Sequence, residues 1–451
     1  MAEGRRIMVP RYFPWLEGFG IMAAMIPEKA FERLLGLDEC WAVVAAEYET
    51  EPIERFFLVM RETAKLWPKL KCPVATCAHH EVVCHDHTEV RVWRHLDAFG
   101  KRTELLCAPP RARCGACRHV WRVPVPWEGE GKHFTRDFEA FALTLMREMP
   151  MKKAGDILGE GDTRLWRLLF KHVDKAYAAL DLSELAHLGV DEMNCRKGHN
   201  YLTVFADLVA RRVVFATEGK DHTTFQRFAE EIVKHNGHPK AITAVAMDLS
   251  KAYQKGAREE LGNAQIVFDP FHVTALVGEA VDEVRRREAA SSPELRATLK
   301  HTMHALRKNP ENLTAGQEKQ LGALDLKHLA TGQAYLVRLE LRDIYQHTLK
   351  PARARYRLES WLGWVRGKCE RFGECLAPLA KAADTIEKHL DGILAHWTSN
   401  WLSTGFLEGL NSVFSAVKRK ARGYRSREYM TAMLYFVAGK LNIPSLCSHG
   451  K

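Results

Sequence analysis

Two closely spaced pairs of cysteines constrain the first part of this chain most strongly. Cys72 and Cys77 form one pair, Cys114 and Cys117 form the other, and 36 residues lie between the pairs. Thiolates on two tight turns match the tetrahedral ligand set of a structural zinc ion. We predict one zinc ion bound by these four residues within a β-rich module at residues 31–130. Four free thiols are the alternative, as is a variant that uses a neighbouring ligand: His79, His80, Cys84, Cys107 or His119.

Length and charge limit the remaining possibilities. The chain has 451 residues and a formal net charge of +10, from 66 Lys and Arg against 56 Asp and Glu. A basic balance favours a polyanionic partner, with nucleic acid first, although a soluble basic protein without one has the same composition. No apolar run reaches the roughly 18 residues that cross a bilayer. We expect a cytoplasmic, nucleoid-associated protein with no membrane partner, preceded by an extension at residues 1–30.

Residues 131–182 have the pattern of a helix-turn-helix. Apolar residues at helical spacing precede Gly159, which suits the turn, and Asp162 or Thr163 then begins a second amphipathic helix. The second helix of such a motif enters the DNA major groove. We predict DNA contacts by three residues near its start, Thr163, Arg164 and Arg167. A helical hairpin without a DNA role is the alternative.

Three acidic residues stand out in the second half of the chain. Asp191 and Asp248 each end a short apolar strand in an α/β region at residues 183–270. Glu408 lies on a predicted helix, where Gly405 and Gly409 are expected to allow close approach. Converging carboxylates repel one another, and divalent metal ions relieve that repulsion. Taken singly, each acid is better explained as a helix cap or a surface charge.

The rest of the chain is predicted to be mainly helical. A helical domain is expected at residues 271–398, and residues 399–451 carry the helix of Glu408 and a basic tail. We predict that this tail contacts DNA phosphates, although a solvated charge run is the alternative. Its basic residues include Lys418, Arg419, Lys420, Arg422 and Arg425.

The order of these features resembles a bacterial insertion-sequence transposase of the ISL-three (ISL3) type. The closest likeness is the segment Ser403-Thr-Gly-Phe-Leu-Glu408-Gly-Leu-Asn411 with the basic residues that follow it. The resemblance implies a ribonuclease-H-like α/β domain interrupted by a helical insertion, with Asp191, Asp248 and Glu408 as a DDE triad that binds two Mg²⁺ or Mn²⁺ ions. Asp269-Pro-Phe-His272 resembles an accessory motif of such enzymes. The usual Asn before the glutamate motif is replaced here by Thr404.

The resemblance also implies an activity. The expected protein binds the terminal inverted repeats of its element on double-stranded DNA, cleaves the 3′ ends and joins them to target DNA. At least a dimer is expected on DNA. The alternative is a non-catalytic zinc-finger and helix-turn-helix regulator derived from a transposase. No Walker-type loop and no strand-borne Gly-x-Gly-x-x-Gly motif is present, which disfavours P-loop ATPases and Rossmann dehydrogenases.

Overall fold

The computed structural model divides the chain into two compact units. It describes residues 27–50, 54–77, 81–196, 200–324, 327–399, 401–420, 424 and 426–445. The first unit comprises the chain up to residue 176 together with the segment from residue 442, and the second comprises residues 177–441. Among the described residues, no helix has both the length and the apolar character needed to span a bilayer.

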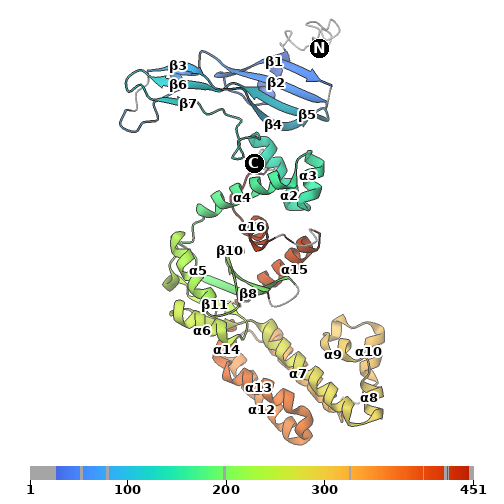
Figure 1. The fold of residues 1–451 in the computed structure, drawn as a ribbon. Coiled ribbons are helices and arrows are strands. Elements are labelled where there is room, and N and C mark those ends of the chain that lie inside the picture. Colours follow the sequence, from blue (N-terminus) through green and yellow to red (C-terminus); the bar gives the residue numbers. More distant parts are fainter. Residues whose placement is uncertain are drawn as a thin grey trace, which may run out of the picture. The chain divides into compact units, whose positions relative to one another are not determined.

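The first unit begins with two small sheets, which confirms the predicted β-rich region (Figure 1). After helix α1 (Pro27–Leu34), a four-stranded sheet has the order β1-β2-β5-β4 and buries Trp93 and Leu105 completely. Its strands are β1 (Trp41–Glu49), β2 (Arg55–Glu62), β4 (Arg91–Ala98) and β5 (Lys101–Cys107). The second sheet has the order β3-β6-β7, from β3 (Val82–His87), β6 (Pro110–Cys114) and β7 (Val120–Arg122).

Three helices complete the described core of this unit. Helix α2 (Arg136–Glu148) is capped by Thr135, whose side chain accepts a hydrogen bond from the Phe138 amide. Helix α3 (Met151–Leu158) ends at Gly159, whose φ of 64° is readily adopted by glycine. Helix α4 (Asp162–Ala178) follows after a short turn. The predicted helix, glycine turn and second helix are therefore confirmed.

A buried acidic residue ties this turn to the four-stranded sheet. Glu160 is 8% exposed, and its carboxylate lies 3.2 Å from Arg102 Nη2 on β5 and 2.5 Å from Arg164 Nη1 on α4. Arg94 on β4 donates to the Leu158 carbonyl at 3.4 Å. Because buried charges must be paired, this network holds the helix-turn-helix against the sheet.

The second unit is built on a mixed five-stranded sheet with the order β10-β9-β8-β11-β12. Strands β8 (His187–Arg196), β9 (Asn200–Asp207) and β10 (Arg212–Glu218) are antiparallel, whereas β11 (Ala244–Met247) and β12 (Gln265–Phe268) run parallel to each other, and β11 runs parallel to β8. Helices α5 (Thr223–Lys234), α6 (Lys251–Glu260) and α16 (Arg427–Ala438) pack around it. Phe205 of β9 stacks on Phe228 of α5 at 4.5 Å between ring centroids.

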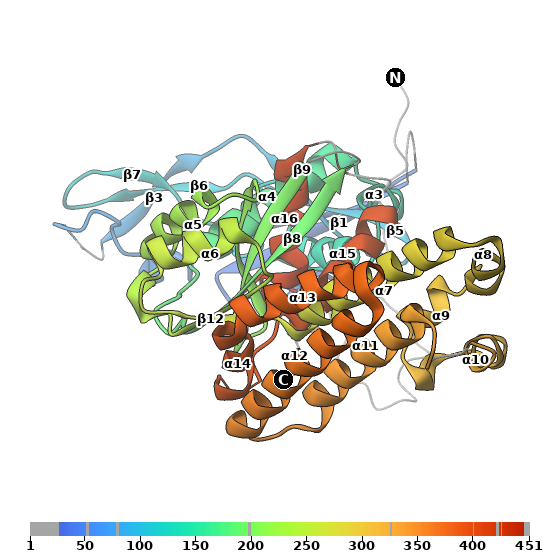
Figure 2. The same cartoon turned by 90° about the horizontal axis from the view of Figure 1, so that it is seen from below.

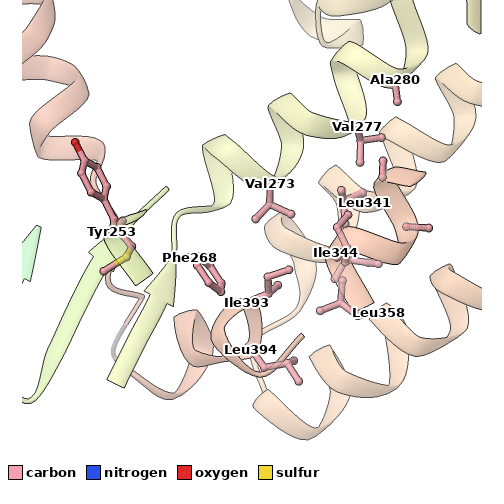
Figure 3. Close-up of a cluster of buried hydrophobic side chains, with 14 of the residues drawn as sticks. Tyr253, Phe268, Val273, Val277, Ala280, Leu341, Ile344, Leu358, Ile393 and Leu394 are labelled. Atoms are coloured by element: carbon pink, nitrogen blue, oxygen red, sulfur yellow. The ribbon is translucent and has the colours of Figure 1, made fainter. Parts of the chain in front are cut away.

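The described segments from residue 270 to residue 399 form helices and turns. Helices α7, α11, α12 and α13 pack against one another (Figure 2). Their core continues from the sheet, as Phe268, Val273 and Ile393 show in Figure 3. The helices are α7 (Pro270–Ser291), α8 (Pro293–Leu299), α9 (Met303–Arg307), α10 (Ala315–Gly322), α11 (Ala330–His347), α12 (Pro351–Phe372), α13 (Ala377–Lys388) and α14 (Leu390–Thr398). The chain then returns to the sheet through α15 (Gly405–Lys420).

Candidate functional site

Two of the predicted acids lie side by side on neighbouring parallel strands. The prediction that Asp191 ends its strand was wrong, because β8 continues to Arg196, whereas Asp248 directly follows β11. Gly189 of β8 pairs with Ala246 of β11, and Asp191 and Asp248 each come two residues later. Side chains alternate along a strand, so both acids share the sheet face of Gly189 and Ala246. The segment that precedes α15 packs on this face, since Ala246 belongs to a small buried cluster that Leu402 contacts.

Helix α15 approaches β8 closely because of a glycine on the strand. A Cβ at Gly189 would lie 2.6 Å from Leu208 Cδ2 and 3.1 Å from Leu407 Cδ1 of α15, so glycine leaves room for both side chains against the strand. The sequence prediction assigned close approach to Gly405 and Gly409, and this was wrong. A Cβ at Gly409 would meet nothing within 4 Å, and one at Gly405 would meet only Ser403 Oγ, at 3.3 Å.

Asp191 is held between its own strand and α15. Its Oδ1 accepts a hydrogen bond of 2.8 Å from the Glu192 amide, and its Oδ2 accepts one of 2.7 Å from Asn411 Nδ2. Asn411 follows Glu408 by three residues, which places both on one side of the helix. Asn411 was not predicted as a site residue, and its spacing from Glu408 was the available signal in the sequence.

Asp269 connects the strand end of β12 to the start of α15. It is 2% exposed, and its Oδ1 accepts a hydrogen bond of 2.7 Å from the Phe271 amide at the start of α7. Its Oδ2 accepts from the Thr404 hydroxyl at 2.6 Å and also from the Thr404 amide. The Thr404 carbonyl in turn accepts from the Glu408 amide at 3.1 Å. Asp269 therefore positions the helix turn that carries Glu408.

The acids influence one another electrostatically. Burial raises the pKa of Asp191, and the charge of Asp248 adds to this rise, while His272 opposes it. Burial also raises the pKa of Glu408, with further contributions from Asp269 and Asp191. Each shift shows that the surroundings disfavour the charged form of the carboxylate. The structure therefore brings the three predicted acids, Asp269 and His272 into one electrostatic neighbourhood.

The carboxylates are nevertheless not drawn tightly together. Among the described residues, the groups whose ligand atoms all lie within 4.8 Å of one another do not include the set Asp191, Asp248 and Glu408. Glu408 Oε1 is buried without a hydrogen-bond partner. Buried, mutually repelling oxygens with an unsatisfied lone pair suit divalent cations, and two ions spaced about 3.5–4 Å apart would accept a wider set of ligands than one ion. The residues present therefore fit a two-metal site.

A further acid lies on the opposite face of β8. Glu192 follows Asp191 directly, so its side chain points to the other side of the sheet. Burial raises the pKa of Glu192, and the charges of Asp248 and Asp191 contribute to the rise. Tyr253 of α6 opposes this rise, and its hydroxyl lies 2.8 Å from Thr203 Oγ1. Adjacency to Asp191 was the only sequence signal for this neighbour.

The four predicted cysteines form one cluster in the first unit. Their sulfur atoms all lie within 4.8 Å of one another, with 3.5 Å between Cys72 and Cys117 and 3.7 Å between Cys77 and Cys114. A tetrahedral site with Zn–S bonds of about 2.3 Å places sulfurs about 3.8 Å apart. Backbone amides, that of Cys117 foremost, lower the pKa of Cys114 to about 6, whereas burial raises the pKa of Cys72 to about 12. The residues therefore fit zinc.

The variant ligands proposed from the sequence do not join this cluster. Cys84, Cys107 and His119 lie outside the four-sulfur group, although all three are described. His79 and His80 fall outside the described residues. The four-cysteine set is thus the one that the geometry favours.

The predicted DNA-contacting residues of α4 differ in their surroundings. Thr163, Arg164 and Arg167 are all exposed near the start of the helix. Arg164, however, pairs with Glu160 and lies 4.8 Å from the centre of the Phe134 ring. Its guanidinium therefore also has a structural role within the unit.

Part of the basic tail can be placed. Lys418, Arg419 and Lys420 belong to α15, but only the side chain of Lys418 is among those described. Arg422 and Arg425 fall outside the described residues. Phosphate contact by this tail stays a prediction.

Acids on neighbouring strands beside a helix that carries a third acid, together with a helix-turn-helix, are features of proteins that act on DNA. Comparison with known proteins identifies the group within this class. A model of the ISL3 transposase family matches residues 188–434, and a model of the helix-turn-helix domain of transposase family ISL3 matches residues 123–173. The chain belongs to the ISL3 family of transposases.

Full-length relatives agree with this assignment. The transposase for insertion sequence element IS1001 of Bordetella parapertussis is 28% identical over 414 residues, which is 90% of this chain and 97% of the relative. The transposase for insertion sequence element IS1557 of Mycobacterium tuberculosis is 26% identical over 460 residues, which is 93% of this chain and 98% of the relative. The similarity thus extends over nearly the whole of each protein.

Proposed function

We propose that this protein is the transposase of an insertion sequence, and that it cleaves the 3′ ends of its element and joins them to target DNA. The observation that carries this proposal is the placement of Asp191 and Asp248 on adjacent parallel strands, on the face against α15, where the charge of Asp248 acts on Asp191 and the charge of Asp191 acts on Glu408. Ligands of α/β sheets bind beyond the carboxyl ends of parallel strands, and the pairing of β8 with β11 ends at Gly189, two residues before Asp191. The order of the five strands supports the ribonuclease-H-like assignment.

Asp191, Asp248 and Glu408 are proposed to hold two divalent cations, Mg²⁺ or Mn²⁺. When bound, such ions supply Lewis-acid stabilisation of the attacking and leaving oxygens in phosphoryl transfer. Asn411 orients Asp191 by donating to its Oδ2, and Asp269 fixes the start of α15 through Thr404. The attacking groups are water and then the freed 3′-hydroxyl, so no protein nucleophile is needed.

DNA recognition is assigned to the first unit and to the basic tail. We propose that the zinc module at residues 31–130 and the helix-turn-helix at residues 131–182 bind the inverted repeats as at least a dimer, in the cytoplasm. The catalytic domain would comprise residues 183–270 and 399–451, with residues 271–398 as its helical insertion. Lys418 and its basic neighbours would contact the phosphate backbone near the cleaved bond.

The second candidate is a DNA-binding regulator that has lost catalysis. The enzyme is favoured because the cluster of acids lowers the stability of the folded protein. Burial and like charges disfavour the ionised forms of Asp191 and Glu408, and Glu408 Oε1 lacks a partner. A protein that only binds DNA gains nothing from this arrangement.

The two candidates are separated by an end-cleavage assay. Purified protein is incubated with labelled DNA that carries the terminal repeats of its element, in Mg²⁺ or in EDTA. The enzyme is expected to produce 3′ nicks and joined products in Mg²⁺ alone. A regulator would bind the same DNA without nicking it under either condition.

A further inference from the structure

A second group of metal-ligating side chains lies in the first unit, apart from the four cysteines. Glu62, Cys84 and His87 each offer a ligand atom, and these atoms all lie within 4.8 Å of one another. His87 Nε2 and Glu62 Oε1 are 2.7 Å apart. Since this group contains one sulfur, one ring nitrogen and one carboxylate, it differs from the clusters of acids that are common on protein surfaces.

The backbone of β3 is shaped to bring two of these residues together. Cys84 and His87 are three residues apart, so in a regular strand they would point to opposite faces of the sheet. The pairing of β3 with β6 shifts register between Cys84 and Asp86, and such bulges re-aim side chains. The register shift therefore explains how the thiol and the imidazole reach the same carboxylate.

The neighbouring charged residue on the strand is turned to another partner. Asp86 forms an ion pair with Arg111 of β6, and the Arg111 Nε atom lies 2.6 Å from Asp86 Oδ1. This pair holds the shifted segment of β3 against β6. Glu62, the last residue of β2, is then the carboxylate that completes the group, with a side chain that is only 11% exposed.

We propose that Glu62, Cys84 and His87 form a second metal site, for a divalent cation of the zinc class. Sulfur, imidazole and carboxylate are the ligand types that zinc accepts, with ligand atoms about 3.3–3.8 Å apart around a tetrahedral ion. The 2.7 Å contact between His87 Nε2 and Glu62 Oε1 is a hydrogen bond, which an ion would replace as the two side chains move apart by about 0.6 Å. Three protein ligands leave the fourth position open to water or to another ligand, whereas the four-cysteine site is closed. This site is independent of the carboxylates of the second unit and of the function proposed for them.

Metal counting tests the proposal. Untagged full-length protein is equilibrated with excess Zn²⁺, freed of unbound metal and measured by mass spectrometry. The wild type should hold two zinc ions per chain, and Cys84→Ser and His87→Ala should each hold one. Cys84 and His87 are exposed, so these variants should keep the fold. His85→Ala is the matched control, because His85 is an exposed histidine of the same strand outside the group, and it should hold two.

Cobalt distinguishes which site is lost. Co²⁺ bound by four thiolates absorbs more strongly in the sulfur charge-transfer region than Co²⁺ bound by one. The Cys84→Ser variant should therefore lose the weaker component and keep the stronger one. One zinc ion in the wild type, two in Cys84→Ser and His87→Ala, or an equal loss in His85→Ala would each overturn the proposal.

Discussion

The four cysteines of the first unit and the three acids of the second are both ligand sets, but the chain assembles them differently. The cysteines come from two short segments, and their sulfurs already lie at the spacing of a bound zinc ion. The acids come from two strands and a helix, and their oxygens remain more widely spaced. Sulfurs of which only some are ionised can pack together without metal, whereas buried carboxylates repel one another.

This difference suggests that the two sites affect the stability of the fold in opposite ways. A closed sulfur site contributes free energy to folding. An open carboxylate site costs stability, and the surrounding fold must hold it in place through contacts such as Asn411 with Asp191 and Asp269 with Thr404. Removal of a ligand should therefore destabilise the first site and relieve strain at the second.

The largest effect is expected at the cysteine site. Cys114→Ser should remove one zinc ion and the associated free energy, on the order of 10 kcal/mol at neutral pH, so the N-terminal module should unfold. The zinc content of the protein measures the loss of the ion, and limited proteolysis measures the unfolding of the module. Cys369→Ser in the second unit is the control and should change neither. Unchanged zinc and protease resistance in Cys114→Ser would remove the contrast between the two sites.

The carboxylate site should respond to pH and metal in the opposite sense. The pKa values of Asp191 and Glu408 are raised above their ordinary 3.8 and 4.5, so their contribution to stability is present below those values and is lost as pH rises through the raised ones. Mg²⁺ binds the deprotonated acids and should restore stability at higher pH, by about 2.7 kcal/mol at a concentration of 100 times its Kd.

Glu408→Gln sharpens this test because it removes one titrating group. The unfolding free energy of the variant should rise relative to the wild type as pH increases above about 4.5 in EDTA. The gain from Mg²⁺ should shrink in the same variant. A difference between the two proteins that does not change with pH would mean that the acids do not strain the fold.

A smaller effect is expected from two arginines on α4. Arg167→Ala should weaken binding to the terminal repeats by about 1–3 kcal/mol with little change in stability. Arg164→Ala should lower stability by roughly 1–3 kcal/mol, because the buried Glu160 loses a charged partner. Gel-shift titrations and thermal unfolding measure both quantities. If Arg164→Ala weakened DNA binding as much as Arg167→Ala and left stability unchanged, the assignment of roles would be reversed.

The smallest effect concerns the basic tail. Replacement of Lys418, Arg419 and Lys420 by Gln should weaken binding to all DNA sequences alike and reduce the slope of log affinity against log salt by about one per lost phosphate contact. Binding measured over a range of salt concentrations on specific and unrelated DNA checks this. An unchanged slope would show that the three residues do not contact phosphate.

Local patterns in the sequence were enough to predict much of this molecule. Cysteine spacing, the glycine turn before Asp162 and the apolar strand before Asp248 depend on neighbouring residues. The same kind of pattern wrongly placed a strand end at Asp191, whereas β8 continues to Arg196. The contacts that complete the acid site do not. Asn411 and Asp191 are 220 positions apart, and Thr404 and Asp269 are 135 apart, so their pairing follows from the packing of α15 on the sheet.

Two further features depend on backbone geometry that a sequence pattern does not reveal. Glycines beside Glu408 suggested where the helix approaches the sheet, but the close contact lies at Gly189 on the strand instead. The grouping of Cys84 with His87 depends on a register shift in β3, and the spacing of the residues in the sequence does not predict that shift. Both features depend on which face of a strand or helix is turned toward its neighbour.

The central claim is that the acids of the second unit perform DNA cleavage and do not support the fold. The most direct measurement compares wild type and Asp248→Asn in Mg²⁺ on DNA carrying the terminal repeats, with 3′ nicking and binding followed in the same samples. We predict that nicking falls by roughly a hundredfold to a thousandfold, as expected from the loss of several kcal/mol of transition-state stabilisation, while binding and thermal stability stay near wild type. Nicking at the wild-type rate by Asp248→Asn would contradict the account.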